Sequence, residues 1–210
     1  MDAKKHWEQV YTTKSTDSVS WYQAHATRSL HHIHETGLPV SASIIDVGGG
    51  ASTLVDDLLG EGFSSLTVLD LSAAALSAAR SRLGERAECV TWIEANITDV
   101  VLPAEAYDLW YDRACFHFLT ARQERRAYIS ALHRAVKADG YVIIATFADD
   151  GPPQCSGLPV MRYSPAELHA EIGQTFTLLR QEREDHLTSS GAVQKFIYCS
   201  FRRVAADLAD

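Results

Sequence analysis

The sequence predicts an α/β protein with a doubly wound, mostly parallel seven-stranded sheet that ends in an antiparallel C-terminal hairpin. Three observations support this fold class. Short apolar runs typical of buried strands alternate with segments whose apolar residues recur at helical spacing. A glycine turn, Gly48-Gly49-Gly50, joins the first apolar run to a helical segment, and two strand-like segments end the chain. Strands that alternate with helices form parallel sheets with right-handed crossovers, covered on both faces.

The elements follow in order from these patterns. The first forty residues carry apolar side chains at helical spacing, Trp7 and Tyr11 among them, and predict helices over 3–12 and 19–36. Further along the chain, Ser72 is a favourable helix N-cap, and a proline suits the first turn of a helix. The other expected elements are strands at 42–47, 65–69, 89–94, 106–111, 141–147, 175–185 and 193–203, and helices that begin near Ala51, after Ser72, at 121 and at Pro165.

Composition limits the classes of partner. The 210 residues suit one α/β domain, and 46% hydrophobic with 22% charged residues is typical of a globular protein. The net charge of −8 argues against a nucleic-acid partner, which needs a basic face. No apolar run approaches the roughly 18 residues of a membrane span, so we expect no membrane partner. The composition does not predict the oligomeric state.

Cysteine and histidine spacing predicts no metal site. The four cysteines lack CxxC spacing, which disfavours a zinc site or a redox pair. His31, His32 and His34 fall at helical spacing that does not converge on one ion. Widely spaced single cysteines and an N-terminus without an apolar signal segment favour a cytoplasmic location.

The glycine turn and Asp70 predict a cofactor that contains adenosine. Ligands of open α/β sheets bind beyond the carboxyl ends of the strands, where strand order reverses. Gly48 and Gly50 let the backbone approach such a ligand closely. A carboxylate at Asp70, where the second strand ends, can accept hydrogen bonds from both hydroxyls of a ribose. Dinucleotides and S-adenosylmethionine share this ribose.

Three features favour S-adenosylmethionine. Thr53 stands where the dinucleotide pattern has its third glycine. Asp46, inside the first strand, would oppose a pyrophosphate but suits a cationic amino group and sulfonium. Asn96 follows the third strand, where its amide reaches the adenine edge while Ile97 packs on the ring. Each residue also has a structural interpretation, as a strand acid bonded to backbone or as a turn asparagine.

At these residues the chain resembles the class I S-adenosylmethionine-dependent methyltransferases over nearly its whole length. Asp46-Val47-Gly48-Gly49-Gly50 resembles the first motif, Asp70-Leu71-Ser72 the ribose-binding acid with its helix cap, and 107–113 the fourth-strand motif. The N-terminal aromatic residues resemble the helical cover of small bacterial members and of some protein-lysine methyltransferases. Ser52 stands where a third glycine is commoner, and Asn96 where the family more often has aspartate.

The resemblance implies a Rossmann-like methyltransferase fold in one domain, 1–210. We divide it into an N-terminal helical cover (1–40), a cofactor-binding core (41–148), and an acceptor loop, helix and hairpin (149–210). S-adenosylmethionine is the implied cofactor and S-adenosylhomocysteine the product. The implied cofactor-binding residues are Trp21, Tyr22, Asp46, Gly48, Gly49, Gly50, Ser52, Asp70, Leu71, Asn96, Ile97, Asp112 and Arg113. The acceptor-binding residues that we expect are Trp7, Tyr11, His117 and Arg162.

The acceptor is less clearly encoded. Methyl transfer is an in-line displacement from an activated donor, so the protein mainly aligns the reactants. A thiol, selenol or acidic hydroxyl needs little more, whereas an amine or alcohol benefits from a general base. Asp112 and His117 are the candidate catalytic residues, although His117 also fits a structural role. Arg113 and Arg162 are candidate anchors for an anionic acceptor, and the long loop 148–162 is expected to form a pocket wall.

Four functions remain open. A methyltransferase that acts on a small molecule is favoured, since the N-terminal cover and the long loop suggest an enclosed site. A protein-lysine methyltransferase is the alternative within the class. Outside it stand an NAD-dependent dehydrogenase, which Thr53 disfavours, and a non-enzymatic adenosyl-binding scaffold.

Overall fold

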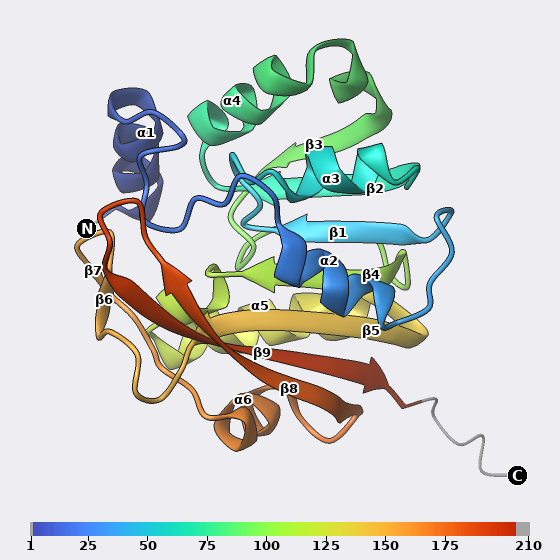
Figure 1. The fold of residues 1–210 in the computed structure, drawn as a ribbon. Helices are drawn as coiled ribbons and strands as arrows, with labels where there is room; N and C mark the ends of the chain where they lie inside the picture. The colour runs from blue at the N-terminus through green and yellow to red at the C-terminus, as the bar shows by residue number, and fades with distance from the viewer. Residues whose placement is uncertain (1, 205–210) are drawn as a thin grey trace, which may run out of the picture.

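The computed structural model describes residues 2–204, which form an α/β fold on a seven-stranded sheet (Figure 1). The strand order is β3-β2-β1-β4-β5-β9-β8. Strands β1 to β5 pair in parallel, and β9 runs antiparallel to both β5 and β8. The strands span Ser43–Val47 (β1), Ser65–Asp70 (β2), Val90–Glu94 (β3), Tyr107–Arg113 (β4), Val136–Phe147 (β5), Phe176–Leu187 (β8) and Val193–Arg203 (β9). The predicted fold class is confirmed.

Helices cover both faces of the sheet and divide the core in two. They span Ala3–Thr13 (α1), Thr27–His34 (α2), Leu54–Gly60 (α3), Ala73–Leu83 (α4), Arg122–Ala135 (α5) and Pro165–Ile172 (α6), with 3-10 turns at Gly84–Cys89 and Phe116–Phe118. On one face, Leu132 of α5 and Leu168 of α6 pack against the sheet. On the other face, Ile33 of α2, Leu58 of α3 and Leu76 of α4 do the same. Because both faces are covered, the central strands are almost continuously apolar.

The order of the strands sets the position of the site. From β1 the chain passes to β2 and β3 on one side, and then crosses to β4 on the other. Crossovers that leave in opposite directions open a crevice beyond the carboxyl ends of β1 and β4. Helix α1 lies across this end of the sheet, where the arrowheads of the parallel strands point in Figure 1.

Two helices begin later than the sequence predicts, because tertiary bonds replace their first turns. Helix α2 begins at Thr27 and not at 19, since the Asp57 carboxylate accepts from the Ala26 N–H at 2.8 Å. Helix α3 begins at Leu54 and not near Ala51. The Arg82 guanidinium donates there to the Ala51 carbonyl, at 2.9 Å.

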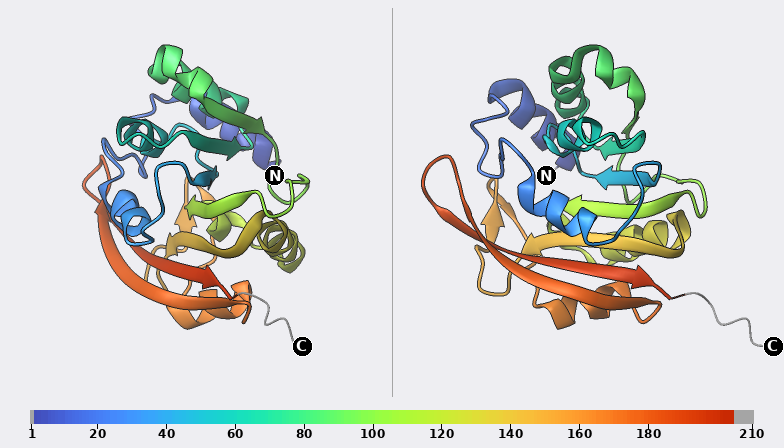
Figure 2. Two further views of the ribbon diagram at one scale, coloured as in Figure 1. Left: turned by 90° about the vertical axis from the view of Figure 1, so that its right-hand side faces the viewer. Right: turned by 45° about the vertical axis from the view of Figure 1, so that its right-hand side comes forward.

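The loop 148–162 contains a short hairpin, β6 (Gln154–Cys155) and β7 (Leu158–Pro159). Val160 and Met161, which follow it, pack against the two cores. The longer hairpin β8–β9 forms one edge of the twisted sheet, as both views in Figure 2 show.

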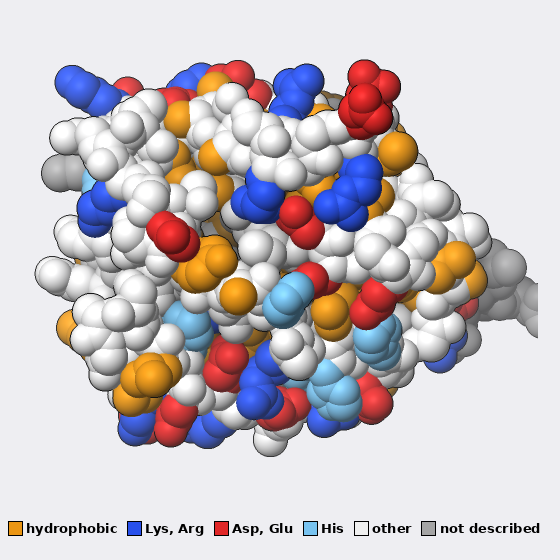
Figure 3. Space-filling model, turned by 45° about the horizontal axis from the view of Figure 1, so that its top comes forward, with side chains coloured by type: hydrophobic (Ala, Val, Ile, Leu, Met, Phe, Trp, Pro, Cys, Tyr) orange, Lys and Arg blue, Asp and Glu red, His pale blue; other side chains and the backbone are white. Residues whose placement is uncertain are grey.

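Positive and negative side chains are interspersed on the face shown in Figure 3, with histidines among them. Within residues 2–204 no helix is long and apolar enough to cross a membrane.

Candidate functional site

Two adjoining cavities lie at the carboxyl ends of β1, β2 and β4. The larger one, about 170 Å³, extends along the end of β2 and the segment after β3. The smaller one, about 50 Å³, lies between the turn after β1 and the segment before α2. Both are lined by Tyr11, Trp21, Gly48 and Arg113, so the two cavities meet at these residues.

The turn after β1 needs glycine at two positions. Gly48 has φ +72°, and a Cβ there would lie 2.5 Å from the Cβ of Cys115. Gly50 has φ +46°, and its Cβ would lie 2.9 Å from the Asp70 carboxylate. Positive φ is easy only for glycine, and a side chain would also push the turn away from Cys115 and Asp70. Gly48 therefore lines both cavities, whereas Gly50, expected at the cofactor, lines neither and packs the turn against Asp70.

Asp70 ends β2 with its carboxylate in the larger cavity. One oxygen accepts a hydrogen bond from the Ser72 N–H at 2.8 Å. Burial raises the pKa of Asp70 to about 6, although backbone hydrogen bonds from Ser72 and Leu71 oppose the shift. Asp70 is thus mostly ionised near neutral pH and remains able to accept further hydrogen bonds.

Asp46, in β1, is buried beside the smaller cavity. Burial, and then the like charges of Asp112 and Asp70, raise its pKa to about 8. No hydrogen bond from residues 2–204 stabilises this carboxylate. An acid buried without a partner is costly, and a cation in the smaller cavity would remove that cost.

The segment after β3 meets the larger cavity through Asn96 and Ile97. The amide of Asn96 is used locally. Its oxygen accepts from the Thr98 N–H at 3.1 Å, and its nitrogen donates to Asp99 at 3.0 Å. The structure therefore brings Asn96 to the cavity but commits its side chain to a turn. Buried Ile97 and the neighbouring Leu71 supply apolar surface instead.

Helix α1 is fastened over the larger cavity. The Glu8 carboxylate accepts hydrogen bonds from the Ala73 and Ala74 N–H groups at the start of α4, at 2.6 and 3.2 Å. Lys4 pairs with Glu94 at the end of β3, at 2.6 Å. Acids are favourable at a helix N-terminus, so the Glu8 contact stabilises both helices. No local sequence pattern predicts this contact, since Glu8 and α4 lie far apart in the chain.

Aromatic rings from three segments wall the part of the larger cavity beneath α1. The ring centroid of Trp7 lies 5.6 Å from that of Trp21 and 5.0 Å from that of Phe118, and both pairs pack edge to face. Trp21 Nε1 donates to the Tyr11 hydroxyl at 3.2 Å. Cys155 of β6 completes this wall. Trp7, Tyr11 and Trp21 were expected near the site, whereas Phe118 and Cys155 were not.

Asp112 and His117, the expected catalytic residues, line neither cavity. Asp112 is buried and accepts from the N–H groups of Cys115 and Phe116 and from the Tyr128 hydroxyl, so it holds the turn after β4. His117 Nδ1 accepts from the Phe147 N–H at 3.2 Å. Burial, followed by the positive charge of Arg113, lowers the pKa of His117 to about 3, which keeps the ring neutral.

The remaining expected residues divide between cavity and surface. Tyr22, Gly49 and Ser52 line the smaller cavity together with Arg113. Arg162 is exposed and donates to the Gly151 carbonyl at 3.2 Å, away from both cavities. The long loop does contribute to the wall, but through Cys155 and not through the apolar residues that follow it.

Comparison with known proteins agrees with this geometry. A family described as a methyltransferase domain matches residues 45–144. EEF1A lysine methyltransferase 2 of Mus musculus is 21% identical over 162 residues, which cover 70% of this chain and 66% of that protein.

Solved structures share the fold over nearly the whole chain. One, from work on the conversion of a disulfide bond into a thioacetal group during echinomycin biosynthesis, has a TM-score of 0.77 at 21% identity and covers 97% of this chain and 94% of its own. The 1,6-didemethyltoxoflavin-N1-methyltransferase of Burkholderia thailandensis, with 1,6-didemethyltoxoflavin and S-adenosylhomocysteine bound, has a TM-score of 0.69 at 18% identity and covers 96% and 84%. The matched domain and the crevice at the switch of strand order identify the chain as an S-adenosylmethionine-dependent methyltransferase, an enzyme that transfers a methyl group from that cofactor to an acceptor.

Proposed function

We propose that the two cavities together bind S-adenosylmethionine and that the methyl group goes to a small-molecule acceptor. The observation that carries the acceptor assignment is the aromatic wall formed by Trp7, Trp21 and Phe118. Above it, α1 approaches the β6–β7 hairpin, with His6 Nε2 3.4 Å from Ser156 Oγ. An acceptor between these elements is enclosed, as suits a small molecule better than a folded protein surface.

In this proposal the cofactor lies across both cavities. Asp70 accepts hydrogen bonds from the ribose, and Leu71 and Ile97 pack on the adenine. The methionine part enters the smaller cavity, where its ammonium group pairs with Asp46. The unpartnered carboxylate of Asp46 supports this orientation, because the ammonium supplies the cation that the carboxylate lacks.

The side chains around the acceptor favour a nucleophile that needs no deprotonation by the protein. Burial raises the pKa of Tyr11, of Cys115 and, to about 11, of Cys155, so all three are protonated at neutral pH. Glu124, at the outer rim, accepts from the Ala121 N–H at the start of α5. Thiolates and heteroaromatic nitrogens meet this condition, and alignment supplies the rest of the rate enhancement.

Protein-lysine methylation is the second candidate, and the similarity to EEF1A lysine methyltransferase 2 favours it. The two candidates differ in where the methyl group arrives. The enzyme is incubated with methyl-labelled S-adenosylmethionine and a cell extract divided into macromolecules and small molecules. We expect label in a small-molecule product that is chromatographically distinct from S-adenosylmethionine, and loss of this product with the Asp70→Ala variant. Label recovered as methyl-lysine from the protein fraction alone would overturn the small-molecule proposal.

The cytoplasmic location remains a prediction from the sequence.

A further inference from the structure

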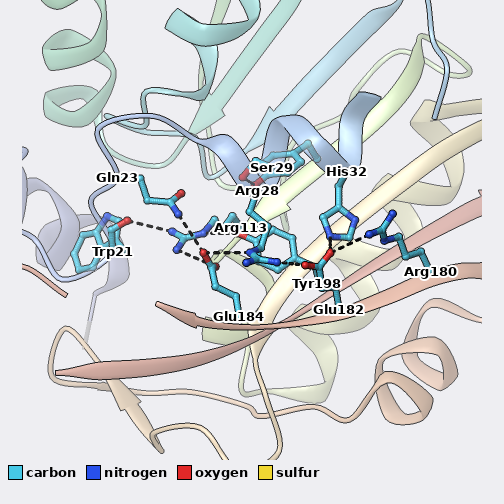
Figure 4. A network of polar contacts seen from close by, with 11 residues as sticks. Trp21, Gln23, Arg28, Ser29, His32, Arg113, Arg180, Glu182, Glu184 and Tyr198 are labelled. Carbon is cyan, nitrogen blue, oxygen red and sulfur yellow. Dashed lines mark hydrogen bonds and ion pairs between the residues drawn. The ribbon is translucent and has the colours of Figure 1, made fainter. Parts of the chain in front are cut away.

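A buried polar network joins the segment before α2 to the hairpin β8–β9 (Figure 4). Its centre is Arg113 at the end of β4, whose side chain is only 10% exposed. Arg113 Nε donates to the Tyr198 hydroxyl at 2.8 Å, and Nη1 donates to the Trp21 carbonyl at 3.1 Å. The same guanidinium lies over the Phe196 ring, 4.5 Å from its centroid. Arg113 therefore connects the aromatic wall of the site to strands from the far end of the chain.

Glu184 of β8 is the acid that faces this arginine. Its carboxylate lies 3.7 Å from Arg113 Nη2, 3.6 Å from Arg28 Nε and 3.5 Å from Gln23 Nε2. These contacts exceed ordinary hydrogen-bond lengths, and within the described chain Arg113 Nη2 and Glu184 Oε2 have no hydrogen-bond partner. The Glu184 side chain is 11% exposed. Its negative charge attracts three donors at once, and none of these contacts is a short hydrogen bond.

The network bears on the site through Trp21. Its carbonyl is held by Arg113, and its indole lines both cavities and donates to Tyr11. Gln23, two residues later, lines the smaller cavity and reaches Glu184. The position of this segment thus depends on a hairpin more than 150 residues away in sequence.

We propose that Glu184 is a positioning residue for methyl transfer, because it holds Arg113 and Gln23 and thereby fixes Trp21 where the two cavities meet. The inference rests on the proposed function only in placing cofactor and acceptor in these cavities. Without the carboxylate, Arg113 is a buried charge without its counter-ion. The guanidinium then turns toward other acceptors or water, and the Trp21 carbonyl loses its donor.

Glu182 provides a matched control on the same strand and the same face. It pairs with Arg28 and, at 3.3 Å, with Arg180, and it lies 3.3 Å from His32 Nε2, but it makes no ion pair or hydrogen bond with Arg113 or Gln23. Replacing it removes the same charge from the same network. Any general loss of stability is therefore shared by both variants, whereas displacement of Trp21 is specific to Glu184.

The test labels the full chain with fluorotryptophan and records fluorine NMR spectra without cofactor, with signals assigned by single Trp→Phe variants. Glu184→Gln is expected to shift the Trp21 signal and to leave the signal of core residue Trp110 in place. Glu182→Gln is expected to leave both in place. With an acceptor found in the extract assay, Glu184→Gln lowers kcat about 10- to 100-fold with a smaller change in the KM for S-adenosylmethionine.

Equal displacement of Trp21 in both variants, or none in Glu184→Gln, would overturn the proposal. If Glu184→Gln does not fold, Glu184→Asp is used instead. This variant keeps the negative charge but moves it away from Arg113 and Gln23, so a small shift of the Trp21 signal is expected. The spectra of the free protein need no ligand. A failed proposal for Glu184 is therefore distinguishable from a failed assignment of the cavities, which shows as an absence of S-adenosylhomocysteine binding.

Discussion

The cofactor half and the acceptor half of the site are built in different ways. In the cofactor half, the turn after β1 and the end of β2 lie where the local chain places them. Gly48 and Asp70 line the larger cavity, and Gly50 packs against the Asp70 carboxylate. In the acceptor half, the walls come from α1, the segment before α2, the turn after β4 and β6. Long-range contacts such as Arg113 with Glu184 hold them together. Under the proposed assignment, local backbone geometry positions the glycine turn and Asp70 for the donor, whereas tertiary packing forms the walls proposed for the acceptor.

Substitution of Asp70, in the cofactor half, is expected to have the largest effect on ligand affinity. We expect Asp70→Ala to weaken S-adenosylhomocysteine binding at least about 100-fold, because two hydrogen bonds to a charged group are lost. Calorimetry on the purified protein measures it. Asp108→Asn is the control, since Asp108 pairs with Lys137 at the opposite end of the sheet, and it should keep the affinity while losing stability. Unchanged affinity in Asp70→Ala would refute the ribose assignment.

The Gly48→Ala substitution tests the local backbone geometry of the cofactor half. The new Cβ is strained by positive φ and collides with Cys115, so we expect a loss of about 1–3 kcal/mol in the free energy of unfolding. Thermal or denaturant unfolding measures this loss. Adding Cys115→Gly removes the collision but not the strained φ, so part of the stability should return. A Gly48→Ala protein as stable as the parent would contradict the tight packing of this turn.

The raised pKa of Asp46 makes ligand affinity in the cofactor half depend on pH. With a pKa of about 8, Asp46 in the free protein is mostly protonated near pH 7, whereas Asp70, with a pKa of about 6, is mostly ionised. An ammonium group stabilises the carboxylate, so binding releases close to one proton. Affinity for S-adenosylhomocysteine then rises with pH, up to about tenfold per unit, until pH exceeds about 8.

Calorimetry in buffers of different ionisation enthalpy counts this proton. Asp46→Asn should abolish most of the release. The same proton release from Asp46→Asn, or proton uptake by the parent, would show that the methionine part does not meet Asp46. The pH dependence of folding stability has the opposite sign to that of ligand affinity. Because the pKa of Asp46 is raised above its ordinary value of 3.8, its contribution to stability falls as pH rises from that value to about 8.

The smallest expected effect lies at His117, on which the sequence and the structure differ. We expect His117→Asn to change kcat per folded molecule less than about threefold and to leave the pH profile of kcat unaltered, since the ring is neutral and away from the cavities. Stability should fall, because the smaller Asn side chain loses the packing of the buried ring against Phe118 and Phe147. Loss of a titration step near neutral pH would restore His117 as a catalytic base.

These differences explain what could be predicted from the sequence. Asp70 and the glycine turn could be found because strand ends, positive φ and helix caps leave signals within a few residues. His117 and Arg162 were misplaced because the side-chain type reveals chemistry but not direction, and their partners are backbone groups of distant segments. Cys155 had no signal of its own, since a buried thiol and a cavity wall have the same local pattern.

The most direct measurement is a titration of the fluorotryptophan-labelled protein with S-adenosylhomocysteine, followed by fluorine NMR. Trp7 and Trp21 line the larger cavity, whereas Trp110 lies in the core and Trp92 donates to the Ala87 carbonyl beside β3. We expect the signals of Trp7 and Trp21 to shift together until binding saturates, while those of Trp92 and Trp110 stay in place. Binding that moves only Trp92 or Trp110 would contradict it, because the cofactor would then lie outside the two cavities.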